Sequence, residues 1–239
     1  MPVRVEHVMG MPVVVELRDT RDDADELFDA VFGLLRAVDA TFSTYKEESE
    51  ISRIRRGELA LEDASDEVRL VLARCEELRD ETNGYFDATA WGLDPSGYVK
   101  GWAVDRAAAL LDRAGCRDYA VNAGGDMCVR GKTWRVGIQH PTERNAVAKV
   151  IEADDLAVAT SGGYERGEHV RDPHTGLAAS GIASVTVTGP DLGTADAYAT
   201  ATLAMGVERA KHFTARLRGY EALTITSDGR VLATPGFPA

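Results

Sequence analysis

Apolar residues in the first half of the chain follow mostly helical spacing. The apolar run Val13–Leu17 predicts an early strand, and the acidic residues Asp22–Glu26 mark the start of an amphipathic helix that continues to about Val38. The next segment, Thr41–Arg53, lacks this period and is predicted to be a loop. Further helices are predicted over Asp66–Glu81 and from about Gly101 to Ala114, the second ended by Gly115.

In the second half the pattern changes to short strand-like runs separated by glycine-rich turns. These runs are Tyr119–Val121, Trp134–Ile138, Val147–Ile151, Ala157–Thr160 and Ser184–Thr188. Two helices are predicted to follow, over Thr194–Met205 and Glu208–Leu217, and Gly206 ends the first of them. A hairpin is predicted over Leu223–Leu232, because Asp228-Gly229 is a favoured two-residue turn.

The order of these elements favours an α+β fold. Helices and strands come partly in blocks, which differs from the regular alternation of a doubly wound parallel sheet. No internal repeat, low-complexity tract or evident linker interrupts residues 1–239. We therefore expect one domain, a single compact unit of two joined lobes, with mixed or antiparallel sheets flanked by helices.

The net charge restricts the possible ligands. The chain has 239 residues, with 27 Lys or Arg against 39 Asp or Glu, which gives a formal net charge of −12. This charge repels the phosphate backbone of nucleic acids, so no nucleic-acid partner is expected. A phosphate-bearing ligand would need local neutralisation by a metal ion or by a lysine.

Cysteine usage and the amino terminus favour a cytoplasmic location. Cys75, Cys116 and Cys128 are odd in number and none has CxxC spacing, so neither a disulfide framework nor a zinc ribbon is predicted. The amino terminus lacks a basic stretch followed by an apolar run, and no run of about 18 apolar residues occurs. We expect no export signal and no membrane span.

A glycine pair follows the predicted strand at Tyr119–Val121. In Asn122–Asp126, the glycines would let backbone amides approach a ligand closely, but a tight turn between two strands is the simpler explanation. The segment matches neither G-x-G-x-x-G nor a P-loop, so no standard nucleotide fingerprint is present.

Two further segments carry groups suited to phosphate and to a cation. Asp94–Gly101 leads into a helix and places Lys100 at its start, where backbone N–H groups favour anions; the alternative is a solvated surface charge. Asp196 and Thr200 are four residues apart on a predicted helix, so their oxygens can share one face and suit a hard Mg²⁺ ion. The alternative is a helix-start charge and a core threonine.

Thr160–Gly162 and His169–Gly176 bracket a polar, glycine-rich loop. The imidazole of His169 titrates near neutral pH and could accept a proton from an attacking hydroxyl. His174, inside a Pro-x-Thr-Gly turn, fits a structural role. Ser161 is not part of a G-x-S-x-G elbow, so a serine triad is not predicted.

In this order, the segments resemble the ApbE family of FAD:protein FMN transferases from Met9 to about Gly206. The resembling pieces are Met9-Gly10, Phe42–Tyr45 with Ser49–Ser52, Gly84–Asp87, Asp94–Gly101 with Asp105, Asn122–Asp126, Thr160–Gly162, His169–Gly176 and Ala195–Thr200. The resemblance implies one ApbE-like domain over residues 1–239. It also implies that FAD is cut at its pyrophosphate, that FMN is esterified to a Thr or Ser of an acceptor flavoprotein, and that AMP is released.

The resemblance implies roles for particular residues. Asp196, Thr200 and the backbone carbonyl of Gly97 would hold Mg²⁺. Lys100 would neutralise a phosphate oxygen, and His169 would be the general base for the acceptor hydroxyl. The FAD site would be lined by Met9, Tyr85, Phe86, Asp87, Asp94, Lys100 and Val170.

Three positions depart from the family pattern. Met11 stands where relatives commonly carry Thr, Gly97 where Ala is usual, and Ala199 where some relatives have an acid, so the ion would keep an extra water. The same site would also permit a FAD pyrophosphatase that uses water as acceptor. A non-catalytic FAD-binding protein is the remaining alternative, and a monomer or homodimer is expected.

Overall fold

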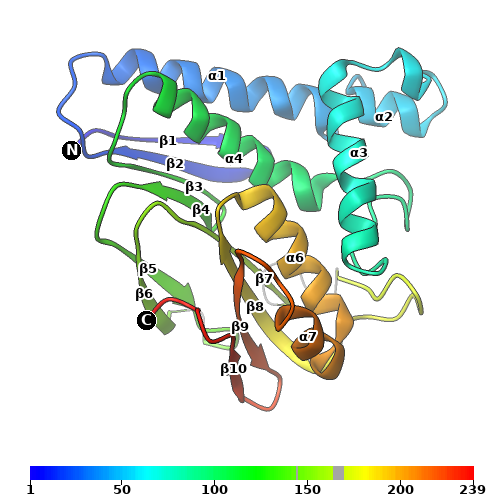
Figure 1. The fold of residues 1–239 in the computed structure, drawn as a ribbon. Helices are drawn as coiled ribbons and strands as arrows, with labels where there is room; N and C mark the ends of the chain where they lie inside the picture. The colour runs from blue at the N-terminus through cyan, green and yellow to red at the C-terminus, as the bar shows by residue number, and fades with distance from the viewer. Residues whose placement is uncertain (144, 164–169) are drawn as a thin grey trace.

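The computed structural model describes residues 1–143, 145–163 and 170–239. Its helices are α1 (Ala24–Phe42), α2 (Glu50–Arg55), α3 (Asp66–Glu81), α4 (Ser96–Arg113), α6 (Leu192–Met205) and α7 (Val207–Thr214), with a short 3₁₀ helix at Leu61–Asp63. Its strands are β1 (Val3–Val8), β2 (Met11–Leu17), β3 (Tyr119–Ala123), β4 (Asp126–Arg130), β5 (Trp134–Gln139), β6 (Val147–Ala153), β7 (Ala157–Gly162), β8 (Ile182–Gly189), β9 (Glu221–Thr226) and β10 (Val231–Ala233). Helices α1, α4 and α6 lie along one side of the larger sheet (Figure 1).

The described strands form two sheets. The larger sheet has the order β1-β2-β3-β4-β7-β8-β9-β10, and β5 pairs with β6 in a separate two-stranded sheet. Every pairing between these strands is antiparallel. The predicted α+β class is confirmed, because antiparallel pairing needs no helical crossover between neighbouring strands.

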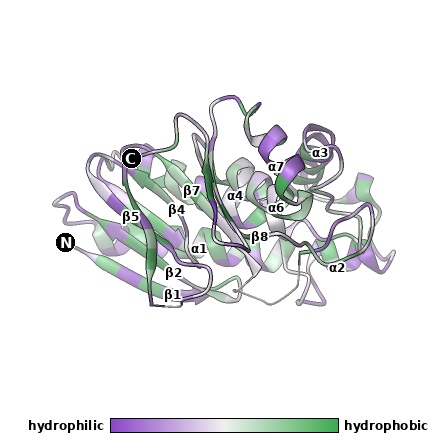
Figure 2. Ribbon diagram, turned by 90° about the horizontal axis from the view of Figure 1, so that it is seen from below, coloured by the Kyte–Doolittle hydropathy of each residue, from purple (hydrophilic) through white to green (hydrophobic). Residues whose placement is uncertain are grey.

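Hydrophobic residues cover both faces of the larger sheet. Along β5, hydrophobic and hydrophilic residues alternate, as expected for a strand with one face buried (Figure 2). A main hydrophobic cluster lies between the sheet and the helices. A smaller cluster joins Trp134, Val136 and Ile151 of the β5–β6 hairpin to Val129 and Val158 of the large sheet. The hairpin therefore covers the face opposite the helices.

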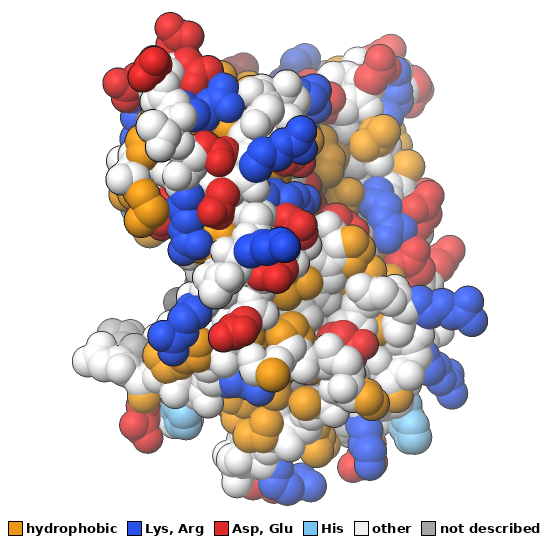
Figure 3. Space-filling view, turned by 60° about the vertical axis from the view of Figure 1, so that its left-hand side comes forward, with side chains coloured by type: hydrophobic (Ala, Val, Ile, Leu, Met, Phe, Trp, Pro, Cys, Tyr) orange, Lys and Arg blue, Asp and Glu red, His pale blue; other side chains and the backbone are white. Residues whose placement is uncertain are grey.

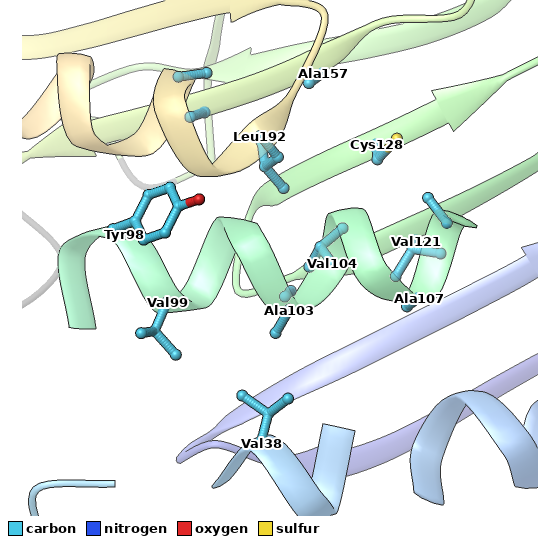
Figure 4. Packing of buried hydrophobic residues seen from close by; sticks show 14 of the residues in the cluster. Val38, Tyr98, Val99, Ala103, Val104, Ala107, Val121, Cys128, Ala157 and Leu192 are labelled. Atoms are coloured by element: carbon cyan, nitrogen blue, oxygen red, sulfur yellow. The ribbon is translucent and has the colours of Figure 1, made fainter. Parts of the chain in front are cut away.

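Helix α4 runs through the main cluster. Its Val99, Ala103 and Val104 are buried with Val38 of α1 and Leu192 of α6 (Figure 4). Burying a valine or leucine side chain stabilises a fold by about 1.5–3 kcal/mol. The apolar face of α4 thus holds this helix, and the polar residues at its start, in a defined place.

Two glycines allow α4 and α6 to pack closely. A Cβ atom at Gly101 would lie 2.4 Å from the carbonyl oxygen of Leu192, and one at Gly193 would lie 2.8 Å from the ring of Tyr98. Such distances are too short for real side chains, so glycine is required at this crossing. The close crossing brings the start of α4 against the middle of α6.

Helix ends agree with prediction where a local signal marks them. The prediction of Asp66–Glu81 is confirmed as α3, and the hydroxyl of Ser65 accepts the backbone N–H of Val68 at 3.4 Å. Gly115 ends α4 with a φ angle of +82°, as predicted for a helix C-terminal glycine. The Asp228-Gly229 turn is also confirmed, since β9 and β10 pair across it.

Other predictions need correction. The loop predicted over Thr41–Arg53 is partly wrong, because α1 continues to Phe42 and Glu50 begins α2, where the hydroxyl of Ser49 accepts the N–H of Ser52 at 3.0 Å. Helix α4 begins at Ser96, five residues before the predicted start, and α7 ends at Thr214 instead of Leu217. Strands β1 and β4 were not predicted. Among the described helices, none is long and apolar enough to cross a membrane.

Candidate functional site

An ammonium group lies between two buried carboxylates where α4, β4 and α6 meet. The Nζ atom of Lys100 forms an ion pair with Oδ2 of Asp126 and lies 3.6 Å from Oδ2 of Asp196. The side chains of Asp126 and Asp196 are 2% and 3% exposed. Buried carboxylates need such compensation, because removing an ion from water costs several kcal/mol. Lys100 is therefore part of the site and not a surface charge.

Hydroxyl groups from two elements lie beside these carboxylates. On α6, Asp196 and Thr200 are one turn apart, as predicted. The Oγ1 atom of Thr200 is 3.2 Å from Oγ of Ser161 on β7. At the start of α4, a Cβ atom on Gly97 would lie 3.9 Å from the same Oγ1 atom. The three residues expected to hold Mg²⁺ thus come from two helices that meet at one place.

The donor set suits a hard cation. Asp196 supplies a carboxylate and Thr200 a hydroxyl, and the described part of the chain has no cluster of three or more His, Cys, Asp or Glu residues that could hold a metal. Mg²⁺ commonly keeps several waters and uses one or two carboxylates together with substrate phosphates. A zinc centre, which needs three or four protein ligands, is not supported by these residues.

The start of α6 is fixed by a partly buried acid on α4. The carboxylate of Asp105 accepts the backbone N–H groups of Leu192 and Gly193, both at 2.8 Å. Burial raises the pKa of Asp105 to about 6, and the two backbone hydrogen bonds lower it only in part. The side chain of Asp191 also accepts the backbone N–H of Thr194 at 2.8 Å. Two carboxylates therefore bond to the backbone N–H groups in the first turn of α6.

Two residues expected to contact FAD lie at the start of α4, the helix that carries Gly97 and Lys100. The ring of Phe86 is buried, and its Cε2 atom would be 3.2 Å from a Cβ atom on Gly97. Asp94 accepts the backbone N–H of Ser96, the first residue of α4, at 3.0 Å. Asp94 itself is exposed, directly before Pro95, which precedes α4.

The neighbouring loop is braced by side chains. Asp87 accepts the N–H and the hydroxyl of Thr89, both at 2.7 Å, and lies 3.6 Å from Nε of Arg79. Tyr85 packs edge-on against His174, with ring centroids 4.6 Å apart, and Nε2 of His174 is 2.9 Å from the carbonyl oxygen of Asn83. The structural role predicted for His174 is consistent with these contacts.

Met9 and Val170 lie in connecting segments. Met9, with a φ angle of +57°, and Gly10 form the tight turn between β1 and β2. Val170 packs against the main hydrophobic cluster, and its carbonyl oxygen accepts the N–H of Ala179 at 3.0 Å. His169, expected to be the general base, lies outside the described residues.

Asp126 and Ser161 belong to segments that the sequence analysis noted, but it gave neither residue a role at the site. Asp126 begins β4 directly after a turn in which Gly124 and Gly125 have φ angles of +61° and +102°. This geometry confirms a tight turn between two strands. The available signal for Asp126 was an acidic residue directly after two glycines. Its pairing with Lys100 could not be read from the sequence, because the two residues are far apart along the chain.

Two cavities lie near the loop that carries Tyr85 and Asp87. One of about 250 Å³ is lined by Cys75, Arg79, Asp87 and Leu93 among others. The other, of about 500 Å³, lies between the end of α3 and α7.

The face in Figure 3 mixes acidic and basic side chains, so the net charge of −12 is not concentrated into one uniform acidic surface there.

Comparisons with solved structures place this fold among the flavin transferases. The flavin transferase ApbE from Vibrio cholerae superposes with a TM-score of 0.86 at 25% identity, covering 99% of each chain. The apo form of Pseudomonas stutzeri flavinyl transferase ApbE gives a TM-score of 0.87 at 24% identity, covering 99% of this chain and 95% of that one. An ApbE protein from Thermotoga maritima gives 0.85 at 23% identity, covering 99% and 97%.

The chain belongs to the ApbE family, whose model matches residues 9–92 and 90–224. It is 37% identical over 170 residues to a FAD:protein FMN transferase of Rhodobacter capsulatus, which covers 62% of this chain and 32% of that protein. It is 36% identical over 152 residues to the FAD:protein FMN transferase of Escherichia coli K12, covering 57% and 43%. These matches span less than half the length of either curated relative.

Proposed function

We propose that this protein is a Mg²⁺-dependent FAD:protein FMN transferase. The observation that carries the proposal is the convergence of Lys100, Asp196 and Thr200, from α4 and α6, around the buried carboxylate of Asp196. Both curated relatives described above are named FAD:protein FMN transferase. FAD would be the substrate, and the acceptor would be a flavoprotein with an accessible Thr or Ser.

The charged residues would act on the pyrophosphate. Asp196, Thr200 and the carbonyl of Gly97 would hold Mg²⁺, which when bound neutralises phosphate oxygens and the developing charge of the AMP leaving group. The ammonium of Lys100 would donate to another phosphate oxygen. This local positive charge would offset the net charge of −12.

The neighbouring residues would hold FAD and the acceptor. Phe86 and Asp94 lie against the start of α4, and Tyr85 and Asp87 are held by the contacts described above. Together with Met9 and Val170, they are proposed to line the FAD site. His169 is proposed to take the proton from the acceptor hydroxyl as its oxygen attacks the FMN phosphorus and AMP departs.

Several broader assignments remain proposals. We propose that residues 1–239 act as one flavin transferase domain that functions as a monomer or homodimer. A cytoplasmic location stays a prediction.

The experiment is AMP release from FAD by the purified protein, with Mg²⁺ and with EDTA, while mass spectrometry follows a flavoprotein acceptor that carries a target Thr. Mg²⁺-dependent AMP release together with an acceptor that gains the mass of FMN is the expected result. AMP release without any change in the acceptor would favour a pyrophosphatase, and FAD binding without AMP release would indicate a non-catalytic protein.

Substitution of the proposed metal ligand sharpens the test. Asp196→Ala should reduce AMP release by at least about a hundredfold at ordinary Mg²⁺, because it removes the charged ligand. Asp63→Ala, an exposed acid in the 3₁₀ helix, is the matched control and should leave the rate unchanged. Undiminished release by Asp196→Ala would remove this residue from the site.

A further inference from the structure

Asp126 is held in place more firmly than an ordinary ion-pair partner. Asp126 is 1% exposed as a whole residue, and its Oδ1 atom accepts the backbone N–H of Thr160 at 2.7 Å. It is also the first residue of β4, between the glycine turn and a paired strand. Its Oδ2 atom is therefore a fixed negative charge, directed at the ammonium of Lys100.

The ammonium of Lys100 is shared unequally between the two acids. It contacts Asp126 directly but is 3.6 Å from Oδ2 of Asp196, beyond normal hydrogen-bond length. Because the Lys100 side chain is flexible, one carboxylate alone would draw the ammonium fully onto itself. Asp126 keeps it on one side of Asp196.

This arrangement matters for a metal ion at Asp196. A Mg²⁺–oxygen distance is about 2.1 Å, so a bound ion would need close access to that carboxylate. An ammonium paired directly with Asp196 would compete for the same oxygen and repel the ion. An ammonium anchored on Asp126 would instead lie beside the ion, where a phosphate oxygen could reach both.

We propose that Asp126 is a positioning residue that anchors Lys100 and so keeps Asp196 available to the metal ion. This inference rests on the proposed function for the identity of the ligands Asp196 and Thr200. Asp126 acts through Lys100 and contacts neither the metal ion nor the substrate.

A double-mutant cycle read from metal affinity tests the inference. Mn²⁺ binding to the full chain, without FAD, would be measured by calorimetry for the wild type, Asp126→Asn, Lys100→Met and the double variant. Asn retains an acceptor for the N–H of Thr160, and Met retains most of the lysine stem. Circular dichroism would check folding, and Lys100→Gln would replace Lys100→Met if that variant did not fold.

Asp126→Asn should weaken Mn²⁺ binding about tenfold when Lys100 is present and less than about threefold in the Lys100→Met background, a coupling typical of contacting groups. Lys100→Met alone should strengthen binding. Equal losses in both backgrounds would overturn the inference, because Asp126 would then act only through its own charge, and absence of Mn²⁺ binding to the wild type would overturn it as well. Missing AMP release would instead count against the proposed function and leave this result unaffected.

Discussion

At the scale of single residues, the site depends on the oxygen atoms of a few side chains. Asp196 and Thr200 present a carboxylate and a hydroxyl from the same face of α6, and Ser161 approaches that hydroxyl from β7. A threonine inside a helix can also bond to the carbonyl four residues earlier, as Thr202 does with Tyr198 at 2.6 Å. The two threonines therefore differ in what their hydroxyls do, although they are two residues apart.

Thr200→Val tests this difference. The change keeps the shape of the side chain but removes the proposed ligand oxygen, so the Mg²⁺ concentration for half-maximal AMP release should rise at least about tenfold. The control is Thr202→Val, which removes a hydroxyl from the same helix and should leave the Mg²⁺ dependence unchanged. Equal Mg²⁺ dependence in both variants would exclude Thr200 as a ligand.

At the scale of elements, the crossing of α4 and α6 positions the site. Gly101 and Gly193 permit the close approach, and Asp105 bonds α4 to the start of α6. The predicted helix starting at about Gly101 placed this glycine at an end, whereas it lies inside α4. Glycine inside a helix is unfavourable by itself, so its presence reflects the packing demand.

Gly101→Ala should therefore be strongly destabilising. The added Cβ atom would meet the backbone of Leu192 at 2.4 Å, and the helices would have to separate, at a cost of about 2 kcal/mol or more in unfolding free energy. Gly33→Ala on the exposed face of α1, where no atom lies within 4 Å of the new Cβ, should stabilise by up to about 1 kcal/mol. Urea denaturation measures both; a Gly101→Ala protein as stable as Gly33→Ala would contradict the role given to this crossing.

Asp105 predicts a pH dependence at the same crossing. Burial raises its pKa from an ordinary 3.8 to about 6 in the folded chain, so the folded state binds the proton more tightly. The contribution of this group to stability is least favourable above pH 6 and improves as the pH falls toward 4. Between pH 7.5 and pH 5 the gain is about 1 kcal/mol.

Asp105→Asn removes the titrating group and so isolates this gain. The difference in unfolding free energy between the wild type and Asp105→Asn should shift by about 1 kcal/mol in favour of the wild type on going from pH 7.5 to pH 5. Asp63→Asn, with an exposed side chain, serves as the control for the general effect of removing an acid. A pH-independent difference for Asp105→Asn would show that its pKa is not raised.

At the scale of the whole molecule, the reactivity of the three buried cysteines depends on whether the core is folded. Cys75, Cys116 and Cys128 are free and buried, which agrees with the prediction that no disulfide framework forms. Burial raises the pKa of Cys75 and of Cys128 to about 12 and also raises the pKa of Cys116. Few thiolates are thus available to react at neutral pH.

Thiol labelling should consequently follow unfolding of the entire fold. With Ellman's reagent at pH 8, the native protein should react at least about a hundredfold more slowly than the urea-unfolded chain, because the reagent requires an exposed thiolate. All three thiols should react in urea. Rapid labelling of one thiol in the native protein would show that its part of the core opens independently.

The sequence by itself determined those features that depend on neighbours along the chain. Gly115 and Gly206 marked helix ends, Asp228-Gly229 marked a hairpin, and four-residue spacing placed Asp196 and Thr200 on one face. The order of motifs was sufficient to indicate the ApbE family, which the family comparison shows. These signals are local, because caps, turns and helical periods act over a few residues.

Tertiary structure alone decided how distant segments meet. Strands β1 and β4 form because β2 and β3 offer partners, and neither run has a pattern strong enough to predict it alone. The pairing of Lys100 with Asp126 likewise depends on how α4 packs against the sheet. Glycine at position 101 lets α4 approach α6 closely enough for Lys100 to lie near Asp196 as well. Such contacts follow from packing across the core, which no sequence spacing encodes.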